Sequence, residues 1–343
     1  MAGRDRRRRR RRSAAASLGA ALVWAFPTTA PGSAAADDLP VAPIVPVTND
    51  GMRVCLRLAT ASATVEVDLG SGRVTAFTPA DGTNVLAGGP AEAGRPPFGG
   101  LWIWPAPEES WPVLRREGAA PERAFESAGW TATAWRTRHG AAMARLTRSL
   151  GAPLHVTETR RLRVSPYAAT LTVVVRLERT AASSIPLGPA LAVRLATPTR
   201  LVLPADDRAG PPARPISFDP PPRFAWTMGA GAAVYRLALG GEHRFESVVP
   251  ARPWLAAELA RHLFWLRAGA VSSAPPPRVR AYVHRAAGCA ELELAADPAP
   301  LSPGAAAEWE FAVECVPYVA GLEAGELAVR ARLLVGEKEA AAP

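Results

Sequence analysis

Alternation of apolar and polar residues is the main pattern of this 343-residue chain from Arg53 onward. Runs with a period of two residues, or rich in β-branched residues, are typical of half-buried strands. Such runs occupy residues 53–59, 63–69, 73–78, 130–138, 154–164, 169–177, 191–197, 233–239, 278–284, 290–295 and 308–316. Turn-forming segments such as "GSG" and "ADGTN" separate them. Many short strands without intervening helices predict an all-β fold, an antiparallel sandwich with few helices.

Two segments depart from the alternation. The stretch "PWLAAELARHLFWL", residues 253–266, is the best helix candidate, although "HLFWLRA" could equally form a strand. Residues 205–223 are rich in proline and predict a long irregular loop, of the kind that is usually functional or disordered.

The N-terminus has the order of a secretory signal. Arginines at positions 4 and 6–12 precede a weakly apolar stretch, and Ala34 and Ala36 form an A-x-A arrangement. This order predicts a signal peptide over residues 1–36, cleaved near Ala36, and a periplasmic or secreted protein. The other interpretation of the arginine run, a nucleic-acid-binding tail, is disfavoured because the apolar segment and cleavage site follow it directly. A proline-rich linker (37–52), one domain (53–336) and a short tail (337–343) complete the predicted organisation.

Removal of the leader changes the charge of the chain. Residues 1–36 hold eight arginines against Asp5, a net charge of +7, so the +9 of the whole chain falls to +2. That balance predicts no nucleic-acid partner. We expect no stable membrane insertion after cleavage, because no later run of about 18 apolar residues is present.

The cysteines Cys55, Cys289 and Cys315 leave two alternatives open. Cys289 and Cys315 lie on strand-like runs at similar distances on either side of "DPAPLSPG", so a hairpin there would bring them near disulfide range. They could equally be two buried free thiols. Their spacing does not resemble a zinc site, and no metal or cofactor is predicted.

The stretch "GGLWIWPAPEESWP", residues 99–112, combines indole rings with carboxylates. Trp102 and Trp104 share one face of a strand, and Glu108 and Trp111 follow directly. Indole faces can cover the C–H patch of a sugar, while carboxylates and arginines bind its hydroxyl groups. The stretch therefore predicts a carbohydrate-binding surface, with core packing as the alternative role of each tryptophan.

Several segments in the same order carry a family resemblance. They are the Gly72–Arg73 pair in "VDLGSGRVTAFTPADGTNVL", the segment "GGLWIWPAPEESWP", and the late unit "GCAELELAADPAPLSPGAAAEWEFAV". Together they resemble the galactose mutarotase-like (aldose 1-epimerase) superfamily, and within it a bacterial branch of unassigned function, over most of residues 53–317. The resemblance implies a β-supersandwich whose concave face binds a sugar, with Arg73 among its binding residues. Two family features are missing here, an asparagine near Arg179 and a tryptophan near Ala190.

Mutarotation requires a base at the anomeric hydroxyl and an acid at the ring oxygen, on opposite sides of one sugar. The resemblance implies Glu291 as the base, with Glu293 two residues away on the same face. His139 is the first candidate for the acid and His284 the second. The alternative to a catalytic role is that Glu291 is an exposed glutamate on a sheet face and that the histidines are ordinary surface residues.

Two functions follow from these residues. The first is an exported carbohydrate-binding protein with an aldose-epimerase-like fold, with or without mutarotase activity. The alternative is a non-catalytic cell-envelope structural or interaction domain that keeps the fold with a degenerate site.

Overall fold

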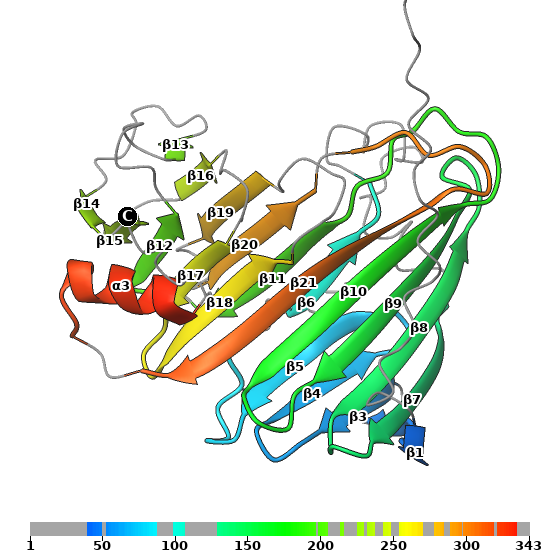
Figure 1. Ribbon diagram of the computed structural model, residues 1–343, viewed down its shortest axis with the longest axis horizontal. Helices are drawn as coiled ribbons and strands as arrows, with labels where there is room; N and C mark the ends of the chain where they lie inside the picture. The colour runs from blue at the N-terminus through cyan, green and yellow to red at the C-terminus, as the bar shows by residue number, and fades with distance from the viewer. Residues whose placement is uncertain are drawn as a thin grey trace, which may run out of the picture.

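Two large antiparallel sheets make up most of the structure (Figure 1). The computed structural model describes residues 40–49, 53–87, 99–106, 129–196, 198–204, 213–215, 225–229, 232–236, 243–247, 254–269, 278–284, 289–296, 298–318 and 321–334. One sheet has eleven strands and the other ten, and neighbouring strands are antiparallel in both. The predicted all-β antiparallel sandwich is therefore confirmed.

The eleven-stranded sheet runs from β1 at one edge to β14 at the other. Its strands, in spatial order, are β1 (Pro40–Pro43), β7 (Thr131–Thr137), β8 (Ala142–Leu150), β9 (Val156–Val164), β10 (Thr170–Arg179), β21 (Ala306–Pro317), β18 (His262–Ala268), β17 (Trp254–Glu258), β12 (Arg200–Pro204), β15 (Ala232–Arg236) and β14 (Ala225–Gly229).

The ten-stranded sheet carries the segments singled out for function. Its strands, in spatial order, are β13 (Ala213–Pro215), β16 (His243–Ser247), β19 (Arg278–His284), β20 (Cys289–Ala295), β11 (Ala190–Ala196), β6 (Leu101–Trp104), β5 (Arg73–Pro79), β4 (Ala63–Asp68), β3 (Arg53–Ala59) and β2 (Val47–Asn49). Residues 40–49, expected as an extended linker, thus supply edge strands to both sheets through β1 and β2.

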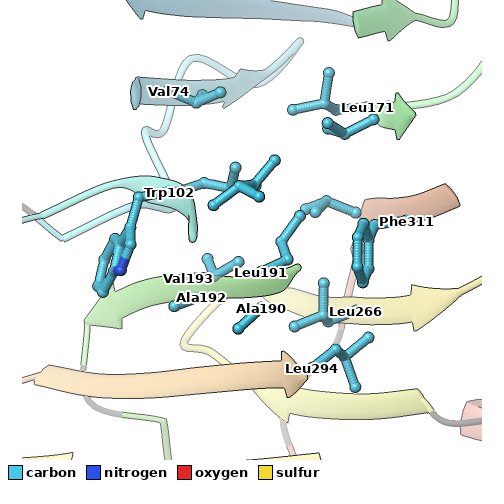
Figure 2. Close-up of a cluster of buried hydrophobic side chains, with 14 of the residues drawn as sticks. Val74, Trp102, Leu171, Ala190, Leu191, Ala192, Val193, Leu266, Leu294 and Phe311 are labelled. Carbon is cyan, nitrogen blue, oxygen red and sulfur yellow. The ribbon is translucent and has the colours of Figure 1, made fainter. Parts of the chain in front are cut away.

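The core lies between the two sheets and follows from the alternation in sequence. In β4 and β10 every second residue is buried, because successive side chains of a strand point to opposite faces. In Figure 2, Phe311 and Leu266 of the eleven-stranded sheet lie beside Leu191 and Leu294 of the other sheet. Side chains from the two inner faces interdigitate in this way in packed sheets.

The predicted helix at residues 253–266 is wrong, and the strand alternative for its second half is right. The segment forms the antiparallel hairpin of β17 and β18. One face of the hairpin joins the main core, through residues such as Leu255 and Phe264. The other face packs Trp254 and Trp265 in a smaller cluster with a C-terminal helix. A strand that is apolar on both faces does not alternate between apolar and polar residues. The sequence of residues 253–266 therefore did not show a strand pattern and was predicted as a helix.

The one helix among the described residues, α3 (Ala324–Leu334), was not predicted. It packs on β12, β14 and β15, beside the hairpin (Figure 1). Arg200 of β12 ties its start to the sheet: the guanidinium donates to Leu322 O (2.7 Å) and to both carboxylate oxygens of Glu258 (2.6 Å each). Burial acts to raise the pKa of Glu258, but hydrogen bonds led by Arg200 outweigh it, so that pKa lies below its usual value. Among all the residues that the structure describes, no helix is long and apolar enough to span a membrane.

The disulfide alternative for Cys289 and Cys315 is wrong. Cys289 lies on β20 of the ten-stranded sheet and Cys315 on β21 of the eleven-stranded sheet, so the two runs do not form a hairpin. All three cysteines are buried, and none of them is in a disulfide. Burial raises the pKa of the Cys289 thiol and that of Cys315, so both stay protonated at neutral pH.

Candidate functional site

The outer face of the ten-stranded sheet carries most of the described residues predicted to bind a sugar. All four residues of β6 are buried and belong to the main core cluster, Trp102 and Trp104 included. Successive side chains of a strand point to opposite faces, so the two tryptophans lie on the side of the sheet opposite Leu101 and Ile103. The same alternation holds in β11, β19 and β20. We call the resulting set the site face: Arg73, Trp102, Trp104, Arg194, Arg280, Tyr282, Glu291 and Glu293.

Strand register places these residues in rows across the sheet. Arg194 of β11 stands opposite Glu291 of β20, and the two form an ion pair at 3.0 Å between Nη2 and Oε2. Glu293 stands opposite Arg280 of β19, with 3.6 Å between Oε1 and Nη1. Both pairs are partly buried, which strengthens the attraction relative to a pair in bulk water. The two late-strand carboxylates are thus held in place by arginines on either side.

Two arginine side chains lie close to the indole ring of Trp102. The guanidinium carbon of Arg73 lies 5.3 Å from the indole centroid, and that of Arg194 lies 5.6 Å from it. Both distances are within the range of cation–π attraction. Arg194 therefore connects Trp102 to Glu291, and residues far apart in the sequence form one contiguous set.

The tryptophans are less accessible than the sequence suggested. Trp102 is 8 % and Trp104 7 % exposed, so neither indole offers a broad face to solvent. In Figure 2 Trp102 lies beside Ala192 and Val193, at the side of the cluster away from Phe311. Stacking of a sugar on either indole stays a prediction, with core packing as the alternative. Arg194, Glu291 and Glu293 are the better exposed part of the site face, whereas Arg73 and Arg280 are as buried as the indoles. Glu108 and Trp111 lie outside the described residues.

His139 is not close to Glu291. It lies exposed in the β7–β8 turn of the other sheet, where its Nε2 accepts a hydrogen bond from Arg138 Nε (3.0 Å). Strand β8 packs across the sandwich from β3, and β3 is five places from β20 in its sheet. At about 4.8 Å per strand, five places correspond to roughly 24 Å. In Figure 1, β7 and β8 lie at the right of the sandwich, whereas β19 and β20 lie toward its upper left.

The second histidine candidate lies on a strand that borders Glu291. His284 is the last residue of β19, in register with Cys289. Tyr282, two residues earlier, stands opposite Glu291 itself. Strand β19 is therefore the element from which a proton donor could accompany Glu291.

A buried charge cluster behind the site face was missed from the sequence. Glu158 accepts from Arg148 Nε (2.8 Å) and from Arg160 Nε (2.6 Å), and all three side chains are almost fully buried. The two guanidinium carbons lie 4.3 Å and 4.4 Å from the ring centroid of Trp130. One feature of the sequence could have revealed the cluster. Glu158 and Arg160 are charged residues at inward positions of β9, between Val156 and Leu162.

Electrostatics keep this cluster ionised. Burial alone would raise the pKa of Glu158, but the charges and hydrogen bonds of Arg148 and Arg160 outweigh it, and the net shift is downward. Burial lowers the pKa of Arg160 to about 10, with Glu158 opposing the shift. Both groups are therefore charged at neutral pH. Within the described part of the chain, no three His, Cys, Asp or Glu side chains are grouped as a metal site requires.

Comparison with solved structures identifies the fold. A candidate mutarotase (YeaD) from Salmonella typhimurium superimposes with a TM-score of 0.54 at 10 % identity, over 81 % of this chain and 97 % of that one. A galactose mutarotase-like protein from Clostridium acetobutylicum gives 0.51 at 11 % identity, over 81 % and 98 %. One from Lactobacillus casei gives 0.50 at 13 % identity, over 76 % and 100 %. No protein-family model and no curated protein matches the sequence.

Proposed function

We propose that this chain, whose fold is that of the galactose mutarotase-like superfamily, binds a saccharide on the site face. The observation that supports this most directly is the contiguous set of Arg73, Trp102, Arg194 and Glu291 on one side of one sheet. Guanidinium groups donate hydrogen bonds and carboxylates accept them, so together they match the mixed donors and acceptors of sugar hydroxyls. Several polyols could satisfy such a surface, and the fold favours a sugar among them.

Mutarotase activity is the catalytic form of the same proposal. Glu291 would take the proton of the anomeric hydroxyl, and a second group would protonate the ring oxygen. The separation of His139 from Glu291 argues against that pair within a single site. The proposal therefore assigns the proton donor to β19, at Tyr282 or His284.

The first test is a titration of the purified protein with D-galactose, D-glucose and maltotriose, followed by tryptophan fluorescence. We expect a saturable change in the wild type and at least about a tenfold weaker affinity in Glu291→Gln. The variant keeps the shape of the side chain but loses a charged acceptor, whose hydrogen bonds contribute about 1.5–3 kcal/mol, and about 1.4 kcal/mol corresponds to tenfold.

Glu66→Gln is the matched control, because Glu66 is a partly exposed glutamate of β4 in the same sheet, 3.9 Å from Arg57. Its sugar affinity should equal that of the wild type. Polarimetry of freshly dissolved D-galactose then separates a mutarotase from a binder. A wild-type protein that responds to no sugar would contradict the proposal and favour the alternative, a non-catalytic envelope domain.

Export is proposed on the arginine run, apolar stretch and A-x-A arrangement of residues 1–36. After expression of the full chain in a Gram-negative host, we expect the protein in the periplasmic fraction or the medium. N-terminal sequencing should begin near Asp37. A cytoplasmic protein that retains residues 1–36 would overturn this part of the proposal.

A further inference from the structure

The pairing between β5 and β6 stops at the edge of the site face. Val74 and Leu101 are the one register pair that joins these strands in the described residues. Continued antiparallel register places Arg73 opposite Trp102, and Gly72 opposite Ile103. Arg73 does lie over the Trp102 ring, at 5.3 Å, although the ladder has already ended there. Something other than strand pairing must fix the two strands at this point.

Arg160, from the opposite sheet, occupies that place. Its Nη1 donates to Gly72 O (2.9 Å) and its Nη2 to Ile103 O (2.8 Å). One guanidinium thus binds a carbonyl of each strand, directly beyond the last ladder pair. Gly72 O precedes Arg73, and Ile103 O lies between Trp102 and Trp104. These carbonyls are buried, where an unpaired acceptor is costly.

A third hydrogen bond, from Nε of Arg160, fixes the orientation of the guanidinium. Nε donates to Glu158 Oε1 (2.6 Å), and Arg148 holds the other oxygen of the same carboxylate. Trp130 packs against both guanidiniums, and a Cβ added at Gly72 would lie 2.2 Å from Trp130 Nε1. The guanidinium is therefore held on every side, and the two carbonyls it binds are held with it.

We infer that Arg160 is a positioning residue for the site face: it clamps β5 to β6 where their ladder ends, and so keeps Arg73 over Trp102. The importance of this clamp for ligand binding rests on the proposed function, while the clamp itself does not. Lysine cannot replace it, because a single ammonium group lacks the planar fork that reaches three separate acceptors.

The indole resonances of ¹⁵N-tryptophan-labelled protein test the clamp without any ligand. In Arg160→Lys we expect the Trp102 resonance, assigned through Trp102→Phe, to shift or broaden, while those of the remote Trp254 and Trp265 stay in place. Arg179→Lys is the matched control, because Arg179 is also buried and donates to two backbone carbonyls, Leu154 O and Ile185 O, neither of which belongs to β5 or β6. An unmoved Trp102 resonance in folded Arg160→Lys, or an equal shift in Arg179→Lys, overturns the inference.

A titration with the sugar that binds the wild type most tightly adds the functional arm. Arg160→Lys should weaken that affinity at least fivefold, and Arg179→Lys less than twofold. An equal loss in both variants would reduce Arg160 to a general structural role. If the wild type binds no sugar, the proposed function fails. The indole resonances then still show whether Arg160 holds β5 against β6, because that measurement needs no ligand.

If Arg160→Lys does not fold, hydrogen exchange of the wild type decides. The amides of Val74 and Leu101, the pair that joins β5 to β6 beside the clamp, should then exchange as slowly as those of the β9–β10 ladder. Exchange about a hundredfold faster at these two amides would show that the strands open there and that Arg160 does not hold them.

Discussion

Replacement of Glu158 by glutamine is expected to lower the free energy of unfolding by about 3–5 kcal/mol at neutral pH. The variant leaves two buried guanidiniums, Arg148 and Arg160, without the carboxylate that now lies 2.6 Å from each. An amide oxygen can accept one of their hydrogen bonds, but it does not compensate either charge. Urea denaturation with linear extrapolation measures the difference.

Glu308→Gln is the control for this experiment, because Glu308 forms the same kind of pair with Arg161, at 2.7 Å, on the exposed face of the same sheet. Solvent screening limits such a pair to less than about 1 kcal/mol. Similar losses in the two variants would contradict the assignment of the buried cluster as a major stabilising element.

The pH dependence of the Glu158 effect has a definite sign. The pKa of Glu158 is lower in the folded protein than in the unfolded chain. Its contribution is therefore fully present above the unfolded value of about 4.3 and is lost as the pH falls through the folded value. The gap between wild type and Glu158→Gln should be widest at neutral pH and should narrow below about pH 4.

The fold was predictable because its information is local. Leu171, Val173, Val175 and Leu177 alternate along β10 with Thr172, Val174 and Arg176, two of which are polar, and such alternation determines which face of a strand is buried. The resemblance of residues 99–112 and 288–313 to one superfamily then selected one sandwich among many. The comparison structures confirm that fold.

The failures share a physical cause, which is that sequence spacing carries no information about long-range pairing. The loop after β20 crosses to the other sheet, so the symmetry of Cys289 and Cys315 around it does not make a hairpin. In β17 and β18 the second apolar face is explained by α3, which lies far along the chain. A one-dimensional pattern cannot show which partner will cover a face.

In the candidate site, too, the residues found from the sequence depend on local pattern, and the residues missed depend on long-range pairing. Alternation and resemblance predicted Trp102 and Glu291 as site residues. Strand register puts both on the site face, and their role in sugar binding stays a prediction. Arg194, which connects them, was missed because its position opposite Glu291 depends on the register between β11 and β20. Arg160 was missed because it acts from the other sheet, through backbone carbonyls that have no sequence signature.

Replacement of Gly100 by alanine is expected to lower the free energy of unfolding by at least about 3 kcal/mol. Gly100 has a φ of +85°, and a Cβ there would lie 2.1 Å from Val74 O, a backbone atom of β5. The left-handed conformation costs about 1–2 kcal/mol for a residue with a side chain, and displacement of packed backbone adds about 1–3 kcal/mol. Because Val74 pairs with Leu101, the displacement separates β6 from β5 at their one ladder pair.

Gly82→Ala separates the two contributions, since Gly82 has the same φ of +85° but no atom within 4 Å of an added Cβ. Its cost should be about 1–2 kcal/mol, from conformation alone. Near-ultraviolet circular dichroism should change in Gly100→Ala and not in Gly82→Ala, because β6 carries Trp102 and Trp104. Equal stability losses with unchanged spectra would show that β6 tolerates the displacement, and that the close approach of β5 to β6 does not position the tryptophans of the site face.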